Sequence, residues 1–128
     1  MIYLASPYSG TQAQMQQRYM DTKHATATLL HNKLHIYSPI VHSHEMVCRF
    51  NLPYDALFWK QYNEDMIKRV DRLWLLKIPG WETSKGMGME VEFASSIGLP
   101  ISSVIMDGTK LTLRNSGGEL VGEYALIS

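Results

Sequence analysis

The segment SKGMGME, from Ser84 to Glu90, brings together residue types that could bind an anion and attack a substrate. Gly86 and Gly88 stand where a helix is expected to begin, although glycine weakens a helix, and glycine suits places where the backbone approaches a ligand closely. A helix start also offers free N–H groups to an anion. A flexible loop explains the two glycines equally well, so they do not by themselves identify a ligand.

Glu90 is the residue of this segment that could carry out chemistry. At the α-helical rotation of about 100° per residue, Glu90 falls on the apolar face of the following helix, whereas Glu92 falls opposite. A carboxylate that faces an apolar side is costly unless another group pairs with it, which makes Glu90 a candidate functional residue. Its place near the start of the helix favours the ionised form that a nucleophile needs.

Tyr3 and Asp65 are the other candidates. Tyr3 lies in the short apolar run Ile2 to Ala5, and a buried tyrosine hydroxyl needs a partner, either a carboxylate at a neighbouring strand end or a backbone carbonyl. Asp65 lies at the edge of the core stripe of a predicted helix, which is formed by Phe58, Trp59, Tyr62, Met66 and Val70. It could face the site, or it could pair with Arg69 at the i, i+4 spacing.

The elements that must position these residues alternate along the chain. Strands are predicted at residues 2–5, 35–37, 73–76 and 101–105, helices at 12–32, 55–70 and 90–98, and irregular structure at 40–53. This order predicts an α/β fold, a single-domain Rossmann-like (flavodoxin-like) parallel sheet of four to five strands with flanking helices. Residues 109–128 form an uncertain C-terminal extension that could be a hairpin. Ligands of such sheets bind at the carboxyl ends of the strands.

Composition excludes several functional classes. The chain has 128 residues, and its 12 basic and 12 acidic residues balance, so no overall field favours a nucleic acid polymer or an anionic membrane. Its single cysteine, Cys48, indicates a reducing compartment. No apolar stretch approaches the roughly 20 residues of a membrane span, and no secretion signal is visible. We therefore expect a cytoplasmic protein.

Common cofactor and metal signatures are missing as well. No glycine-rich loop ends in Gly-Lys-Ser/Thr, and the first strand does not lead into G-x-G-x-x-G. His42, His44, Glu45 and Cys48 cluster in the sequence but lack the spacing of a structural metal site. We expect them to line a loop over the pocket or to meet another subunit, and we expect neither a metal nor a cofactor.

Three segments, taken in order, resemble the nucleoside 2-deoxyribosyltransferase superfamily, which includes 2'-deoxynucleoside 5'-monophosphate N-glycosidases and small uncharacterised relatives. They are IYLASPY at the N-terminus, Asp65 followed by VDRLWLL, and GMGMEVEFA around Glu90. The resemblance runs from Met1 to about Ile105 and leaves the tail uncovered. It is most specific at Glu90, less so at Tyr3 and weakest at Asp65.

The resemblance implies a role for each candidate. Glu90 matches the nucleophile that attacks the anomeric carbon of the sugar and forms a glycosyl-enzyme intermediate. Asp65 matches the carboxylate that helps to protonate the departing base, and Tyr3 matches the tyrosine that orients the nucleophile. The logic is that of retaining glycosidases, in which two carboxyl groups lie about 5 Å apart.

Ser84 points to the substrate. Transferases of this superfamily that act on free nucleosides tend to carry aspartate there, whereas the monophosphate hydrolases resemble this chain in having serine, whose hydroxyl can donate to a phosphate. The expected substrate-binding residues are Ser84, Gly86, Gly88, Ser6, Tyr8 and Trp81. Tyr8 and Trp81 could stack a base or simply pack.

The resulting expectation is an N-glycosidase that acts on a (deoxy)nucleoside 5'-monophosphate through a covalent intermediate on Glu90. Three alternatives stay open: a base-exchanging 2-deoxyribosyltransferase, a glycosidase for nicotinamide nucleotides, and a non-catalytic nucleotide-binding module. The resemblance also implies a homodimer or higher homo-oligomer in which a neighbour completes each pocket.

Overall fold

The computed structural model describes all residues from 1 to 128. Its elements are, in order, β1 (Ile2–Ala5), α1 (Gln12–His31), β2 (Ile36–Tyr37), α2 (Pro39–Phe50), α3 (Ala56–Ile67), β3 (Arg72–Leu76), the 3-10 turn η1 (Trp81–Thr83), α4 (Lys85–Ser96), β4 (Ile101–Met106), β5 (Lys110–Arg114) and β6 (Leu120–Ala125). No helix combines the length and the apolar character that crossing a bilayer requires.

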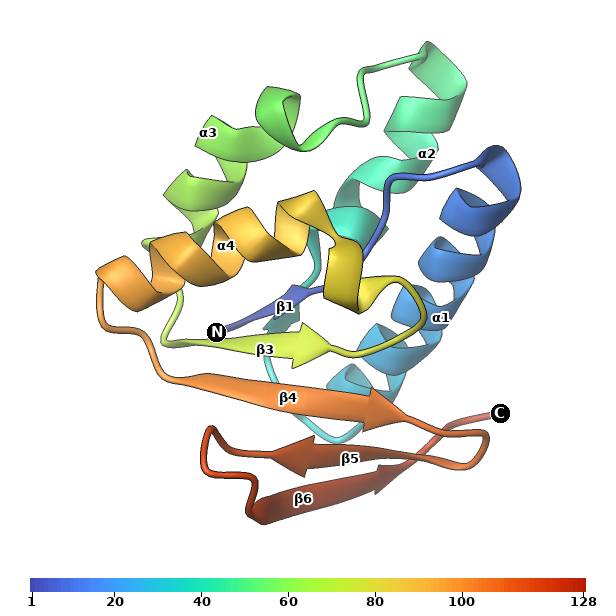
Figure 1. Cartoon of the computed structure of the whole chain (residues 1–128). Coiled ribbons are helices and arrows are strands. Elements are labelled where there is room, and N and C mark those ends of the chain that lie inside the picture. Colours follow the sequence, from blue (N-terminus) through green and yellow to red (C-terminus); the bar gives the residue numbers. More distant parts are fainter.

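The sheet contains six strands in the order β2-β1-β3-β4-β5-β6 (Figure 1). The first four strands run parallel, whereas β5 and β6 are antiparallel to their neighbours. The expected α/β class is thus confirmed. The expected parallel sheet of four to five strands is wrong, because the chain turns back directly after β4 instead of crossing over through another helix.

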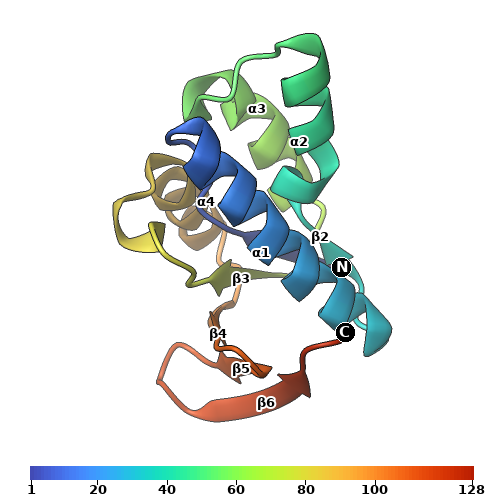
Figure 2. The same cartoon turned by 90° about the vertical axis from the view of Figure 1, so that its right-hand side faces the viewer.

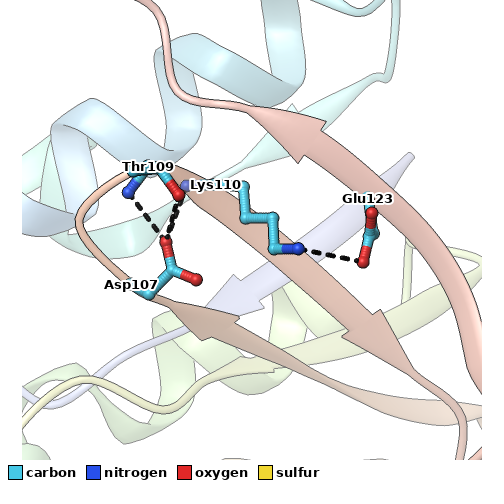
Figure 3. A network of polar contacts seen from close by, with 4 residues as sticks. All are labelled: Asp107, Thr109, Lys110 and Glu123. Carbon is cyan, nitrogen blue, oxygen red and sulfur yellow. Dashed lines mark hydrogen bonds and ion pairs between the residues drawn. The ribbon is translucent and has the colours of Figure 1, made fainter.

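Asp107 forms the turn that reverses the chain (Figure 3). Its Oδ1 accepts hydrogen bonds from the backbone N–H groups of Thr109 and Lys110 at 2.7 and 2.9 Å, and from the Thr109 hydroxyl at 2.9 Å. Such a carboxylate stabilises a tight turn by satisfying its free donors. The hairpin that follows contributes Leu111 to the core, where this side chain is fully buried. The C-terminal extension is therefore part of the sheet.

Helices cover both faces of the parallel strands, with α1 on one face and α3 and α4 on the other (Figure 1). Successive residues of β1 alternate between these faces, as in any strand. Leu4 joins the core under α1, while Tyr3 and Ala5 join the core under α3 and α4. Alternation therefore places Tyr3 on the side of α4. Figure 2 shows the β5-β6 hairpin at the opposite end of the molecule from α2 and α3.

Residues 39–50 form the helix α2, so the expected irregular segment at 40–53 is wrong. The Ser38 hydroxyl caps the helix by accepting a hydrogen bond from the Val41 N–H at 3.1 Å. Pro39 occupies the first helical position, where its missing N–H costs nothing. Asn51 ends the helix in the left-handed region at φ 54°. Ser38 and Pro39 therefore begin a helix.

Candidate active site

A cavity of about 520 Å³ lies at the carboxyl ends of β1, β2 and β3. Residues that follow these strands line it, including Ser6 after β1, Pro39 after β2 and Thr83 after β3, and α3 and α4 supply the remaining walls. This is the edge at which ligands bind in open α/β sheets. The aromatic lining residues are Tyr8, Tyr37, Tyr54, Trp59 and Tyr62.

Glu90 lies in this cavity and is only 8% exposed. The buried residues of α4 are Met87, Glu90 and Ala94, spaced i, i+3 and i+7, so the inward direction expected for Glu90 is confirmed. Burial raises the pKa of Glu90 from 4.5 to about 7, and the hydrogen bond from Tyr3 acts in the opposite direction. Both protonation states of this carboxyl are therefore accessible near neutral pH.

Tyr3 donates a hydrogen bond to Oε2 of Glu90 and is fully buried. The two residues lie 87 positions apart in the sequence, and the partner left open for the Tyr3 hydroxyl is thus a carboxylate. Burial, followed by the negative charge of Glu90, raises the pKa of Tyr3 well above its ordinary value of 10. Tyr3 therefore keeps its proton and remains a donor to Glu90.

The start of α4 forms a second polar part of the cavity. The Ser84 hydroxyl oxygen accepts a hydrogen bond from the Met87 N–H at 3.2 Å, which leaves its own O–H free to donate. Ser84, Lys85 and Gly86 all line the cavity. An added Cβ at Gly86 would come no closer than 3.8 Å to a neighbour, so packing within the protein does not require glycine at this position.

Lys85 is one cation at this helix start, and Arg18 is a second. Its Nη1 donates to the backbone carbonyl of Ser9 at 2.6 Å, which holds the guanidinium at the wall of the cavity. Gly80 allows the approach, because its φ is +100° and a Cβ there would lie 2.3 Å from Nη2 of Arg18. Arg18 was not among the residues expected from the sequence, because its position depends on Gly80, which lies 62 positions later.

Four expected substrate-binding residues, Ser6, Tyr8, Ser84 and Gly86, line the cavity. Ser6 is buried, and its hydroxyl has no hydrogen-bond partner within the protein. The Tyr8 hydroxyl forms a hydrogen bond of 2.7 Å with Nδ1 of His44, which fixes the ring at the cavity wall. The unpartnered Ser6 hydroxyl is available to a ligand.

Asp65 lies outside the cavity, and its expected place beside Glu90 is wrong. Its carboxylate is about half exposed, accepts a hydrogen bond from Gln61 at 3.1 Å and lies 3.8 Å from the Lys68 ammonium. The residue of α3 that does line the cavity is Asn63. Two helix positions correspond to about 200° of rotation, so Asp65 points away when Asn63 points in.

The core stripe assumed for this helix explains the error. It included Phe58, which is 51% exposed, and Trp59, which lines the cavity. Arg69 does approach Asp65, but it donates to the backbone carbonyl of Asp65 at 2.7 Å rather than to the carboxylate.

Gly88 and Trp81 are also corrections, because neither lines the cavity. Gly88 is exposed on the outer side of α4, and nothing lies within 4 Å of an added Cβ. Trp81 packs against the core cluster under α4, and the Lys77 ammonium lies 4.6 Å from its ring centre. The ordinary packing considered for Trp81 is its observed role.

The cluster of His42, His44, Glu45 and Cys48 lies on α2 rather than on a loop. His44 contacts Tyr8, and Nε2 of His42 forms a hydrogen bond of 3.1 Å with the Tyr62 hydroxyl. No group of three or more potential metal-ligating side chains is found in the protein. Both histidines therefore orient tyrosines that line the cavity.

Comparison with known proteins adds one finding. A search of curated proteins gives no match to this sequence. The family model described as Domain of unknown function (DUF1937) matches residues 1–106. This range includes every residue that lines the cavity and stops before the β5-β6 hairpin. The chain belongs to the DUF1937 family.

Proposed function

We propose that the protein hydrolyses the N-glycosidic bond of a nucleoside 5'-monophosphate through a covalent intermediate on Glu90. The observation that carries this proposal is the buried carboxyl of Glu90, hydrogen-bonded to Tyr3 and facing a cavity lined by aromatic rings and two cations. A buried carboxylate at a cavity wall is unfavourable for the fold alone, which favours a catalytic over a purely structural role.

Tyr3 leaves one carboxylate oxygen for the reaction. Its hydroxyl holds Oε2, so Oε1 of Glu90 can form a bond to C1' of the sugar while the bond from C1' to the base nitrogen breaks. Water then attacks C1' and releases the carboxylate. The net reaction adds the elements of water across the glycosidic bond, giving the free base and a sugar phosphate.

The phosphate would lie at the start of α4. Arg18, Lys85 and the free O–H of Ser84 line this side of the cavity, and the N-terminus of a helix attracts anions. Charge-assisted hydrogen bonds are about twice as strong as neutral ones. A monophosphate should therefore bind more tightly than the corresponding nucleoside, which lacks the anionic group.

The cavity rim supports the expected homo-oligomer as part of this proposal. Phe50, Leu57 and Phe58, close to the lining residues Tyr54 and Asp55, are 69%, 64% and 51% exposed. Exposed apolar side chains that gather beside a site are typical of protein contacts. Light scattering of the purified protein and of a Leu57→Asp variant measures this directly, and a monomeric wild-type protein would contradict it.

The test of the proposed function is chromatographic detection of free base. The purified protein is incubated with a panel of nucleoside and deoxynucleoside 5'-monophosphates and with the matching nucleosides. We expect base release from at least one monophosphate and little from its nucleoside. Glu90→Gln should reduce the rate at least about 1,000-fold, as expected for loss of a nucleophile.

Asp65→Asn is the matched control. It makes the same change of carboxylate to amide on the neighbouring helix, but outside the cavity, and it should keep wild-type turnover. No base release from any substrate, or full activity of Glu90→Gln, would refute the proposed function.

A further inference from the structure

The residue of α3 that faces the cavity together with Glu90 is an amide. Asn63 and Glu90 both line the main cavity and a smaller adjoining hollow of about 30 Å³. Oδ1 of Asn63 is buried without a hydrogen-bond partner. A carboxamide can orient a ligand through hydrogen bonds, but it has no proton to transfer at neutral pH. The wall near the nucleophile therefore lacks an acid where one was expected.

The remaining acidic side chains near the cavity are engaged in other contacts. Asp55 is exposed, and its Oδ1 caps α3 by accepting a hydrogen bond from the Phe58 N–H at 2.9 Å. Glu64 lines only the smaller hollow, where its carboxylate lies 2.6 Å from the Lys60 ammonium. Asp55 lines the main cavity, but this cap engages one of its carboxylate oxygens, and Glu64 does not line the main cavity.

The tyrosines of the cavity are weak acids. Burial raises the pKa of Tyr8 to about 12 and raises that of Tyr37 further above its ordinary value of 10. His42 does not line the cavity, and its Nε2 is hydrogen-bonded to the Tyr62 hydroxyl, so a proton from this nitrogen would have to pass through a phenol. Efficient proton donation requires a group whose pKa lies near the working pH. Burial raises the pKa of Glu90 to about 7, but in the proposed reaction Glu90 is the nucleophile.

The cavity is also suited to a cationic ring. The aromatic side chains of Tyr37, Trp59 and Tyr62 line it, and Glu90 supplies a negative charge when ionised. Aromatic faces attract cations that lie within about 6 Å of the ring centre. A positively charged heteroaromatic base would therefore be favoured by both the rings and the carboxylate.

We propose that the substrate is a pyridinium nucleotide, a 5'-monophosphate whose sugar is joined to a ring nitrogen that carries a positive charge. This inference rests on the proposed function. Oε1 of Glu90 bonds to C1', the electron pair of the C1'–N bond goes to the ring nitrogen, and the pyridine leaves as a neutral molecule without a proton. Water then attacks C1', Glu90 is released, and one proton passes to the solvent.

The test compares leaving groups on the same protein. Nicotinamide mononucleotide is assayed beside AMP, CMP, dAMP and dGMP by chromatographic detection of the released base. We expect kcat/KM for nicotinamide mononucleotide to exceed that of each of the other nucleotides by at least about 100-fold. This factor is the lower end of the rate enhancement that a positioned general acid provides. Release of another base at an equal or higher rate would overturn the inference and leave the proposed function intact. No release from any of them would refute the proposed function itself.

Asn63→Asp supplies the acid that the inference says is missing. With a carboxyl at this position, the ratio of kcat/KM for AMP to that for nicotinamide mononucleotide should rise by at least about tenfold, because only the purine needs protonation to leave. Asp65→Asn, outside the cavity, should leave this ratio unchanged.

A series of substituted pyridinium nucleotides, measured with the wild-type protein, keeps the test independent of the folding of Asn63→Asp. Without protonation, kcat/KM should fall steadily as the basicity of the leaving pyridine rises. Rates that do not depend on this basicity, while bond cleavage is rate-limiting, would overturn the inference.

Discussion

The β4-β5 turn and the cavity hold a carboxyl group in opposite ways. Asp107, in the turn before β5, accepts hydrogen bonds from Thr109 and Lys110, and these donors hold its pKa below the ordinary value of 3.8. Glu90, at the cavity, is buried with a single hydrogen bond from Tyr3, and burial raises its pKa to about 7. A carboxylate surrounded by donors stabilises the fold, whereas one with few donors is left reactive.

The neighbouring polar groups show the same contrast. At the hairpin, Lys110 pairs with Glu123 at 3.3 Å in addition to the turn contacts. At the cavity, Ser6, Tyr37 and Asn63 each keep a buried oxygen without a partner in the protein. Buried polar atoms are normally paired, so these three oxygens at the cavity wall are available to a ligand. One further unpaired buried oxygen, Thr22 Oγ1, lies outside the cavity. The hairpin thus contributes to stability, whereas the cavity has unpaired polar groups that can bind a ligand.

The largest effect is expected for Leu111→Ala, which should lower stability at the hairpin and leave the cavity unchanged. Leu111 is fully buried in the core on the hairpin side, and its truncation should lower the free energy of unfolding by about 2 to 5 kcal/mol. Urea denaturation followed by circular dichroism measures this loss. Base release by the folded variant should equal that of the wild type. A comparable loss of kcat/KM in the folded variant would show that the two regions are coupled.

Glu90→Gln should increase stability at neutral and alkaline pH. The folded protein binds the Glu90 proton more tightly than the unfolded chain does, so wild-type stability falls as pH rises from about 4.5 to about 7. A shift of this size corresponds to at most about 3 kcal/mol. The neutral amide does not titrate, so the variant should match the wild type near pH 4 and exceed it at pH 8. A variant that is less stable at pH 8 would contradict the burial cost assigned to Glu90.

Tyr3→Phe should reduce kcat/KM by about 10 to 100-fold at pH 7, the value of one hydrogen bond to a charged group. In the wild type this hydrogen bond lowers the pKa of Glu90. Its loss should raise that pKa and move the acidic limb of the pH profile to higher pH. The control is Tyr124→Phe on the hairpin, which makes the same change far from the cavity. An acidic limb that does not move in Tyr3→Phe would show that Tyr3 does not influence the pKa of Glu90.

The smallest effect is expected for Asp107→Asn. The amide accepts hydrogen bonds from the Thr109 and Lys110 N–H groups less strongly than the carboxylate does, so the melting temperature should fall slightly at pH 7. The difference should disappear as pH falls through the lowered pKa of Asp107, because the wild-type carboxyl then becomes neutral. A difference that persists at pH 2 would point to a change in turn geometry.

Sequence patterns correctly predicted the features that depend on a short stretch of neighbouring residues. The inward direction of Glu90 follows from the phase of its own helix, and the burial of Tyr3 follows from its place in an apolar run. The same method failed at Asp65, because an amphipathic helix beside a cavity has an aromatic face that resembles a core face. Trp59 and Tyr62 line the cavity, and counting them as core rotated the helix in the wrong direction.

Features that depend on distant contacts could not be predicted in this way. Arg18 lines the cavity because Gly80, 62 positions later, leaves room for its guanidinium. The antiparallel hairpin depends on the pairing of β5 with β4 and on the burial of Leu111 and Leu113 under α1. Neither the pairing nor the burial is encoded in a short window of residues.

The bond from Tyr3 to Glu90 joins the first strand to the last helix, and this sets when the site can exist during synthesis. A nascent chain that has exposed only its first 80 residues carries Tyr3 and most of the cavity wall, yet it lacks Glu90, the nucleophile of the proposed reaction. The proposed reaction can begin only after α4 has packed onto the strands. Under that proposal, partly made chains should not react with nucleotides.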